Sequence, residues 1–284
     1  MFLPTTIKEV RERGWDELDV IIFSGDAYID HPAFGPAVIG RILEAEGYRV
    51  AIVPQPNWRD DLRDFRKLGQ PRLFFAVTAG AMDSMVNHYT ANLRLRSNDA
   101  YTPGGKAGFR PDRAVDTYTR ILKRLYPHTP VVVGGIEASL RRLTHYDYWT
   151  NSLRRSVLVS SGADLLIYGM GDKVIREVAR AMRNGFNMKL LRGLRQVGFR
   201  ADREYVERLD VKTTLHLHSF EECCASNEAF GKNFVEEETL SNMMSCDTTL
   251  VEAVDDGYVV ITPPHVTLTT EELDHSFDLP YERA

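Results

Sequence analysis

Four glycine-containing segments hold the residues whose types best suit ligand binding in this sequence. Each segment follows a short apolar run, and each has glycines that let a ligand approach the backbone closely or a carboxylate that can accept hydrogen bonds. The candidate ligand-facing residues in these segments are Asp26, Asp83, Gly134, Gly135, Glu137, Gly169 and Gly171. The same glycines are also typical of tight strand-to-helix turns that bind nothing, so both interpretations stay open.

Two neighbouring pairs of Asp and His have the residue types for acid–base chemistry. Asp30 directly precedes His31, and His145 lies two residues before Asp147. A carboxylate can orient an imidazole and favour its charged form, so each pair is a candidate proton donor and acceptor. Neighbouring residues on a strand point to opposite faces, so Asp30 and His31 could cooperate only in a loop.

The segment from residue 137 to 155 combines many charged and aromatic side chains. Arginines can bind phosphates, and aromatic rings can stack on nucleic-acid bases. The residues concerned are Arg141, Arg142, Arg154 and Arg155, with Tyr146, Tyr148 and Trp149. The alternative is that the rings pack under the next helix while the arginines are solvated or paired with carboxylates.

Several common catalytic motifs do not occur in the sequence. The loop after the first apolar run, SGDAYIDH, lacks the three close glycines of a dinucleotide-binding fold, and neither G-x-x-x-x-G-K-[ST] nor G-x-S-x-G is present. Cys223, Cys224 and Cys246 have neither CxxC nor CxxxCxxC spacing, which indicates reduced thiols. The residues alone therefore identify no catalytic group and no metal ligand.

A parallel α/β sheet is the architecture that would bring the glycine-containing segments together. Short apolar runs predict strands at 19–23, 48–53, 73–77, 131–133 and 164–168. Helical patterns between them predict helices at 36–47, from 83, at 112–125 and at 172–185, and a long polar loop at 97–113. The fold class is α/β, a doubly wound, mostly parallel Rossmann-like sheet of about five βα units, with ligands expected beyond the carboxyl ends of the strands.

Length and composition are those of an ordinary globular protein. The chain has 284 residues, of which 43% are hydrophobic and 26% charged, and no apolar stretch approaches the roughly 20 residues of a spanning helix. The first residues, MFLPTTIKEVRERGW, lack the basic and apolar regions of a secretory signal. We therefore expect a cytoplasmic location and no membrane partner.

The charge of the chain is unevenly distributed. Residues 1–220 carry 33 Lys and Arg against 25 Asp and Glu, whereas residues 221–284 carry 2 against 15. The net charges are therefore +8 and −13. Either the acidic segment packs near the basic part, or the basic part offers a surface to a nucleic acid such as RNA.

The last third of the chain has weaker patterns than the first two thirds. Residues 221–256 are polar and predicted to be helical, and a final strand is predicted at 258–261. In the tail, Thr270 with Glu271 and Glu272 is a candidate capping box. We predict three parts: a Rossmann-like domain at 1–186, a mixed helical segment with an irregular acidic character at 187–262, and a connector at 263–284.

Long motifs in this sequence resemble those of a known family. They are GDAYIDHPAFGPAVIGRILEAEGYRVAIVPQPNW, FFAVTAGAMDSMVNHYTANLRLRSNDAYTPGG, RPDRA, VVVGGIEASLRR, HYDYW, RRSVLV, ADLLIYGMGD and ITPPHVTLTTEELDHSFDLPYERA. Together they resemble the amino-terminal half of the YgiQ-type radical SAM proteins, the uncharacterised protein family UPF0313. The resemblance is weakest from about residue 186 to 256.

The resemblance implies an accessory domain next to a catalytic barrel, with unknown substrate and reaction. In that family a CxxxCxxC loop, which binds a [4Fe-4S] cluster and S-adenosylmethionine, lies beyond the stretch matched here. None of the three cysteines corresponds to a cluster ligand, so this chain alone is expected to bind no cluster. The implied partner is a radical SAM barrel, in the same polypeptide or in a split partner.

VVVGGIEAS followed by ADLLIYGMGD is also similar to the cobalamin-binding-like domain that precedes the barrel in many radical SAM enzymes. This similarity implies a Rossmann-like domain over the barrel mouth. The D-x-H-x-x-G motif that ligates cobalt is absent, because Asp30 is adjacent to His31. Cobalamin bound without a protein ligand stays possible, and a non-catalytic module for RNA or cobalamin is the alternative to the accessory domain.

Overall fold

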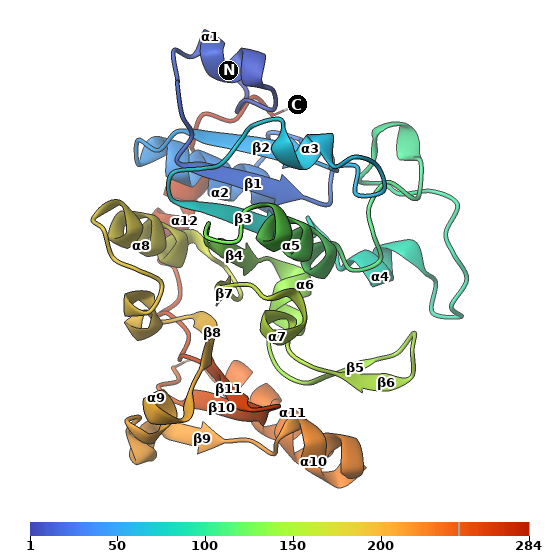
Figure 1. The fold of residues 1–284 in the computed structure, drawn as a ribbon, viewed down its shortest axis with the longest axis vertical. Coiled ribbons are helices and arrows are strands. Elements are labelled where there is room, and N and C mark those ends of the chain that lie inside the picture. The colour runs from blue at the N-terminus through green and yellow to red at the C-terminus, as the bar shows by residue number, and fades with distance from the viewer. Residues whose placement is uncertain (244, 284) are drawn as a thin grey trace.

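Five parallel strands form the centre of the fold in the computed structural model, which describes residues 1–243 and 245–283 (Figure 1). They are β1 (Val20–Ser24), β2 (Val50–Pro54), β3 (Phe74–Thr78), β4 (Val131–Gly134) and β7 (Leu165–Ile167). Their order is β2-β1-β3-β4-β7, with every neighbouring pair parallel. The winding direction reverses between β1 and β3, so the predicted doubly wound α/β fold is confirmed.

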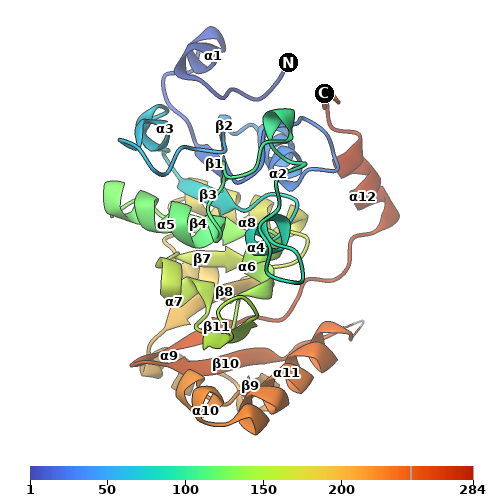
Figure 2. The ribbon, with the colours of Figure 1, turned by 90° about the vertical axis from the view of Figure 1, so that its right-hand side faces the viewer.

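Helices cover both faces of these strands, which explains why the strands are apolar along their whole length. One face packs against α2 (Gly35–Ala45) and α8 (Asp172–Arg183), with α12 (Thr270–Phe277) beside α2. The other face packs against α1 (Ile7–Glu12), α3 (Arg63–Arg66), α5 (Ala114–Leu125), α6 (Ile136–Leu140) and α7 (Val157–Ser161). Figure 2 shows α5 and α7 on one side of the sheet and α2 and α12 on the other.

Four further strands extend the same sheet beyond β7, in the lower half of Figure 1. In spatial order they are β8 (Val197–Ala201), β11 (Gly257–Ile261), β10 (Thr249–Val254) and β9 (Thr214–His216). The sheet therefore continues across residue 186, where the sequence predicts a domain boundary. The predicted strand at 258–261 is confirmed, whereas β8 and β9 had no clear signal in the sequence.

The prediction of helix throughout 221–256 is wrong for residues 249–254, which form β10. Asp255 and Asp256 make a tight turn, with Asp255 at φ 52°, and Val254 pairs with Gly257 in an antiparallel hairpin. The segment TLVEAV is itself rich in apolar and β-branched residues, and pairing with β11 and β9 makes it a strand. The helical part of the prediction is confirmed for α10 (Phe220–Ala225) and α11 (Asn227–Ser241).

Smaller elements complete the chain. They are α4 (Ser84–His88), the hairpin of β5 (His145–Asp147) and β6 (Ser152–Arg154), α9 (Arg203–Glu207), and the 3₁₀ turns η1 (Pro103–Gly105), η2 (Leu190–Gly193) and η3 (Val211–Thr213). Asp83 is the N-cap of α4, as predicted. Within residues 1–243 and 245–283, no helix has the length and apolar character that crossing a membrane requires.

The C-terminal segment runs back along the molecule to the N-terminal end (Figure 2). The backbone N–H of Glu282 donates to Asp30, whose carboxylate also pairs with the buried Arg41. Leu279 and Tyr281 are buried in the same region. Residues 244 and 284, which fall in the predicted mixed segment and connector, lie outside the described residues.

The capping box of α12 begins one residue earlier than predicted. Thr269, not Thr270, is the N-cap, and its hydroxyl accepts the N–H of Glu272 while the Glu272 carboxylate accepts the N–H of Thr269. We expect Thr269→Ala to destabilise α12 by about 1 kcal/mol and to speed hydrogen exchange of its amides roughly fivefold. Thr267→Ala, at an exposed position before the helix, is the control and should leave exchange unchanged; equal effects of both would contradict the capping role.

Candidate functional site

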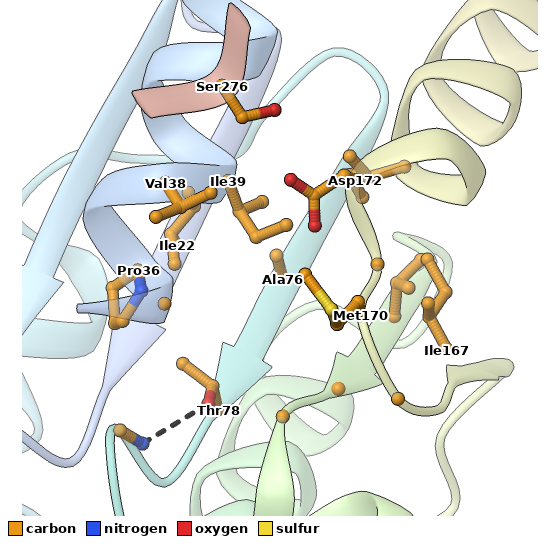
Figure 3. Close-up of a pocket in the computed structure, with 18 of the residues that line it drawn as sticks. Ile22, Pro36, Val38, Ile39, Ala76, Thr78, Ile167, Met170, Asp172 and Ser276 are labelled. Atoms are coloured by element: carbon orange, nitrogen blue, oxygen red, sulfur yellow. Dashed lines mark hydrogen bonds between the residues drawn. The ribbon is translucent and has the colours of Figure 1, made fainter. Parts of the chain in front are cut away.

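An apolar cavity of about 300 Å³ lies at the carboxyl ends of β1, β3, β4 and β7, between α2, α8 and α12 (Figure 3). This is the topological switch point of the sheet, where open α/β folds bind their ligands. The apolar wall is made by the branched side chains of Ile22, Val38, Ile39, Val132, Ile167 and Ile175. The predicted position of the site is the position of the cavity.

Glycines form the rim of the cavity, and at two of these positions a side chain would crowd a neighbouring oxygen atom. A Cβ on Gly135, whose φ is +82°, would lie 2.5 Å from the Thr78 hydroxyl oxygen. A Cβ on Gly134 would lie 3.2 Å from the carbonyl oxygen of Ile167. Gly169 and Gly171 also line the cavity. The glycines therefore let β3, β4 and β7 end close together, and they leave the space above them open.

Asp172 is the charged side chain in the cavity wall. It is the first residue of α8 and only 6% exposed, and its carboxylate makes no hydrogen bond or ion pair with any described residue. Figure 3 shows this carboxylate pointing toward Ile39, between Ser276 and Met170. The positive end of the α8 dipole favours a carboxylate at this position, but it does not replace a hydrogen-bond partner.

The predicted site residue Asp26 lies beneath the loops and does not line the cavity. Its carboxylate accepts from Arg110 Nη2 at 2.6 Å and from the Ala81 N–H at 2.6 Å. Burial raises the pKa of Asp26, and the Arg110 charge only partly opposes this effect. Gly80 must lack a side chain here, because its Cβ would lie 2.1 Å from the Asp26 carboxyl carbon.

Glu137 and Asp83 connect the starts of two helices. The fully buried Glu137 accepts the N–H of Ser84 at 3.0 Å and that of Val115 at 2.9 Å, in the first turns of α4 and α5. Arg141 pairs with Asp83 at 2.7 Å and with Glu137 at 3.3 Å. Burial raises the pKa of Glu137. The two carboxylates accept backbone N–H groups at the starts of α4 and α5, and neither residue lines the cavity.

Neither predicted pair of Asp and His contains a hydrogen bond between its members. The ring Nδ1 of His31 accepts the N–H of Ala33 at 3.1 Å, and the neighbouring Asp30 binds Arg41. Burial lowers the pKa of His145 to about 4, so the ring is neutral near pH 7 and its Nδ1 lies 3.1 Å from the carbonyl oxygen of Leu143. The structure therefore does not bring either pair together for proton transfer.

The arginines near the hairpin are paired with carboxylates. Asp147 pairs with Arg113 and, at 2.7 Å, with Arg154. The other partners are Asp83 for Arg141, Glu237 for Arg142 and Asp255 for Arg155. Their positive charges are therefore balanced within the chain.

Comparison with known proteins identifies the family. A family model described as "Radical SAM N-terminal" matches residues 2–284. The chain belongs to the radical SAM N-terminal family. No solved structure shows a significant match to it.

Curated relatives in this family are named UPF0313 proteins. The chain is 57% identical over 282 residues to one from Porphyromonas gingivalis and 55% identical over 293 residues to one from Bacteroides thetaiotaomicron. It is 44% identical over 283 residues to one from Thermotoga neapolitana. These alignments cover 99–100% of this chain but only 44%, 47% and 48% of the relatives. The chain thus spans less than half the length of these UPF0313 relatives.

The family name implies a [4Fe-4S] cluster and S-adenosylmethionine for the intact protein. Among the residues that the structure describes, no group of three or more His, Cys, Asp or Glu could hold a metal ion. Cys223 and Cys246 are buried, and burial raises the pKa of Cys223 to about 11, which disfavours the thiolate that iron requires. An iron–sulfur cluster therefore does not fit this part of a radical SAM protein.

Cobalamin likewise finds no cobalt ligand in the described part of the chain. His31 does not line the cavity, and its Nδ1 is already engaged with Ala33. The cavity of about 300 Å³ suits a small molecule rather than a complete corrin ring. Cobalamin therefore does not fit this cavity.

Two buried carboxylate residues that line cavities, Asp172 and Glu252, are not among the site residues predicted from the sequence. The sequence predicts Asp172 only as the N-cap of a helix; in the structure Gly171 is the N-cap and Asp172 is the first residue of α8. Glu252 lies in β10 and is 1% exposed, in the wall of a second cavity of about 520 Å³. The sequence analysis predicts helix at this position, and the burial of Glu252 becomes apparent only when β10 pairs with β11 and β9.

Proposed function

We propose that this chain is the accessory domain of a radical SAM enzyme and that its carboxyl edge forms part of the enzyme's substrate pocket. The observation that carries the proposal is the apolar cavity at the switch point, in a chain that belongs to the radical SAM N-terminal family. The UPF0313 relatives are more than twice as long, which leaves room for a catalytic domain. That domain, in the same polypeptide or in a split partner, would be the partner of this chain.

The residues of this chain would bind and orient a substrate rather than react with it. The branched walls exclude water and bury an apolar group, and Asp172 offers one directional contact. The cluster and S-adenosylmethionine would be held by the remainder of the intact protein. As part of the proposal we place the protein in the cytoplasm, the reducing compartment in which free thiols such as Cys224 persist.

Iron analysis tests this proposal directly. We would measure iron, sulfide and the visible spectrum, after anaerobic reconstitution, of this chain and of a form extended to the length of its relatives. We expect iron only in the extended form, together with reductive cleavage of S-adenosylmethionine. A colourless, iron-free extended protein would overturn the proposal and favour a non-catalytic binding module.

A further inference from the structure

We propose that the cavity at the switch point binds a small apolar molecule that carries a protonated amine, and that Asp172 selects the amine. The binding claim stands on the geometry of the cavity alone. The further claim that such an amine is the substrate class of the enzyme rests on the proposed function.

The shape of the cavity favours a compact apolar group. Its walls come from three helices and four strand ends, and most side chains that line it are branched and aliphatic. Two of its apolar residues, Met170 and Phe277, are 61% and 47% exposed, so the apolar surface continues to the outside of the molecule. A ligand of about 300 Å³ or less could bury most of its apolar surface here, which is the main driving force for such binding.

The carboxylate of Asp172 supplies the selectivity for a cation. The Asp172 carboxylate has no partner among the described residues and lies against apolar walls, so a donor or a positive charge in the cavity would stabilise it. A ligand ammonium would supply both, as a charge-assisted hydrogen bond. A ligand anion would be repelled by the same carboxylate.

The cationic and hydroxyl groups near Asp172 are engaged elsewhere. Lys173 pairs with Glu272 at 2.8 Å, and the Ser276 hydroxyl lies 3.3 Å from the Glu272 carbonyl oxygen. The Tyr281 hydroxyl donates to the Ser276 carbonyl oxygen at 2.8 Å. The described residues therefore leave the position opposite the carboxylate to a ligand.

A metal ion is a poorer occupant than an organic cation. Calcium and magnesium need several oxygen ligands, and Asp172 is the single carboxylate among the residues that line the described cavity. The surrounding aliphatic side chains would leave such an ion poorly solvated. The apolar walls instead match the hydrocarbon part of an amine.

The test measures the binding of three probes to the 284-residue chain. Tryptamine, the alcohol tryptophol and indole-3-propionate share the same ring system and differ in their terminal polar group. Isothermal titration calorimetry at neutral pH should show tryptamine binding at least about tenfold more tightly than tryptophol, with the carboxylate probe weakest. This comparison uses only the wild-type chain, so it does not depend on whether a variant folds. Equal affinities for tryptamine and tryptophol, or no binding of any probe, would overturn the proposal.

A variant assigns the preference to one side chain. Asp172→Asn should weaken tryptamine binding about tenfold and leave tryptophol within about twofold. Asp274→Asn, which makes the same charge change at an exposed position of α12, is the matched control and should alter neither affinity. An unchanged preference for tryptamine in Asp172→Asn would overturn the role of Asp172. Because these measurements need neither iron nor turnover, their failure is distinguishable from failure of the iron test.

Discussion

Arg110→Ala should lower the free energy of unfolding by about 3–5 kcal/mol, because it would leave two buried carboxylates without their cation. Arg110 is fully buried, and its guanidinium binds Asp26 at 2.6 Å, Asp99 at 3.2 Å and the Ala79 carbonyl oxygen at 3.0 Å. The Arg110 side chain thus connects the long loop at 97–113 to the residues that follow β1 and β3. Lysine should not restore stability, because it cannot reproduce the planar, forked geometry.

Urea unfolding followed by circular dichroism measures this effect, and the chain offers a matched control. Arg120 pairs with Asp116 at 3.1 Å but is 61% exposed, so Arg120→Ala should change stability by no more than about 0.5 kcal/mol. A loss below about 1 kcal/mol in Arg110→Ala would contradict the proposed anchor. Asp26 would then have to be satisfied by its hydrogen bond from Ala81 alone.

Glu252→Gln should make the protein more stable at pH 8 and remove part of its pH dependence. Burial raises the pKa of Glu252 to about 7, and the nearby Glu237 and Glu221 add to the rise; the hydrogen bonds from Thr144, at 3.0 and 3.2 Å, only partly oppose it. Glutamine keeps an acceptor for the Thr144 N–H and carries no charge. The variant therefore lacks the cost of ionising a buried carboxyl.

The sign of the pH effect follows from proton linkage. Between the ordinary pKa of 4.5 and about 7, the folded protein keeps a proton on Glu252 that the unfolded chain has lost. Stability must therefore fall as the pH rises through this window, by about 3 kcal/mol in total. Glu252→Gln should match the wild type near pH 4 and exceed it by about that amount at pH 8.

Unfolding midpoints in urea at several pH values between 4 and 8 provide the measurement. Glu236→Gln, at an exposed position of α11, removes the same charge and should give a profile parallel to that of the wild type. Parallel profiles for Glu252→Gln and the wild type would show that the carboxyl does not titrate differently in the folded protein. Thr144 would then be sufficient to hold Glu252 ionised.

The parallel half of the fold and the edge of the sheet at which the cavity lies could be predicted from the sequence. Five apolar runs correspond to β1, β2, β3, β4 and β7, because strands buried on both faces must be apolar along their whole length. Once such strands are parallel, their carboxyl ends share one edge, so the glycine-containing segments had to meet there. The family resemblance follows from the same long motifs, and the match over residues 2–284 confirms it.

Which side chains face the cavity and which hold the loops depends on contacts that form only in the folded chain. Asp26 and Asp172 both follow strand-end glycines, yet Asp26 is neutralised by Arg110, which is 84 residues away in sequence, while Asp172 has no such partner among the described residues. Glu252 is buried because its strand, β10, pairs with β11 on one side and with β9 on the other. Contacts between distant residues set the burial and pairing of each charge, and local patterns do not encode them.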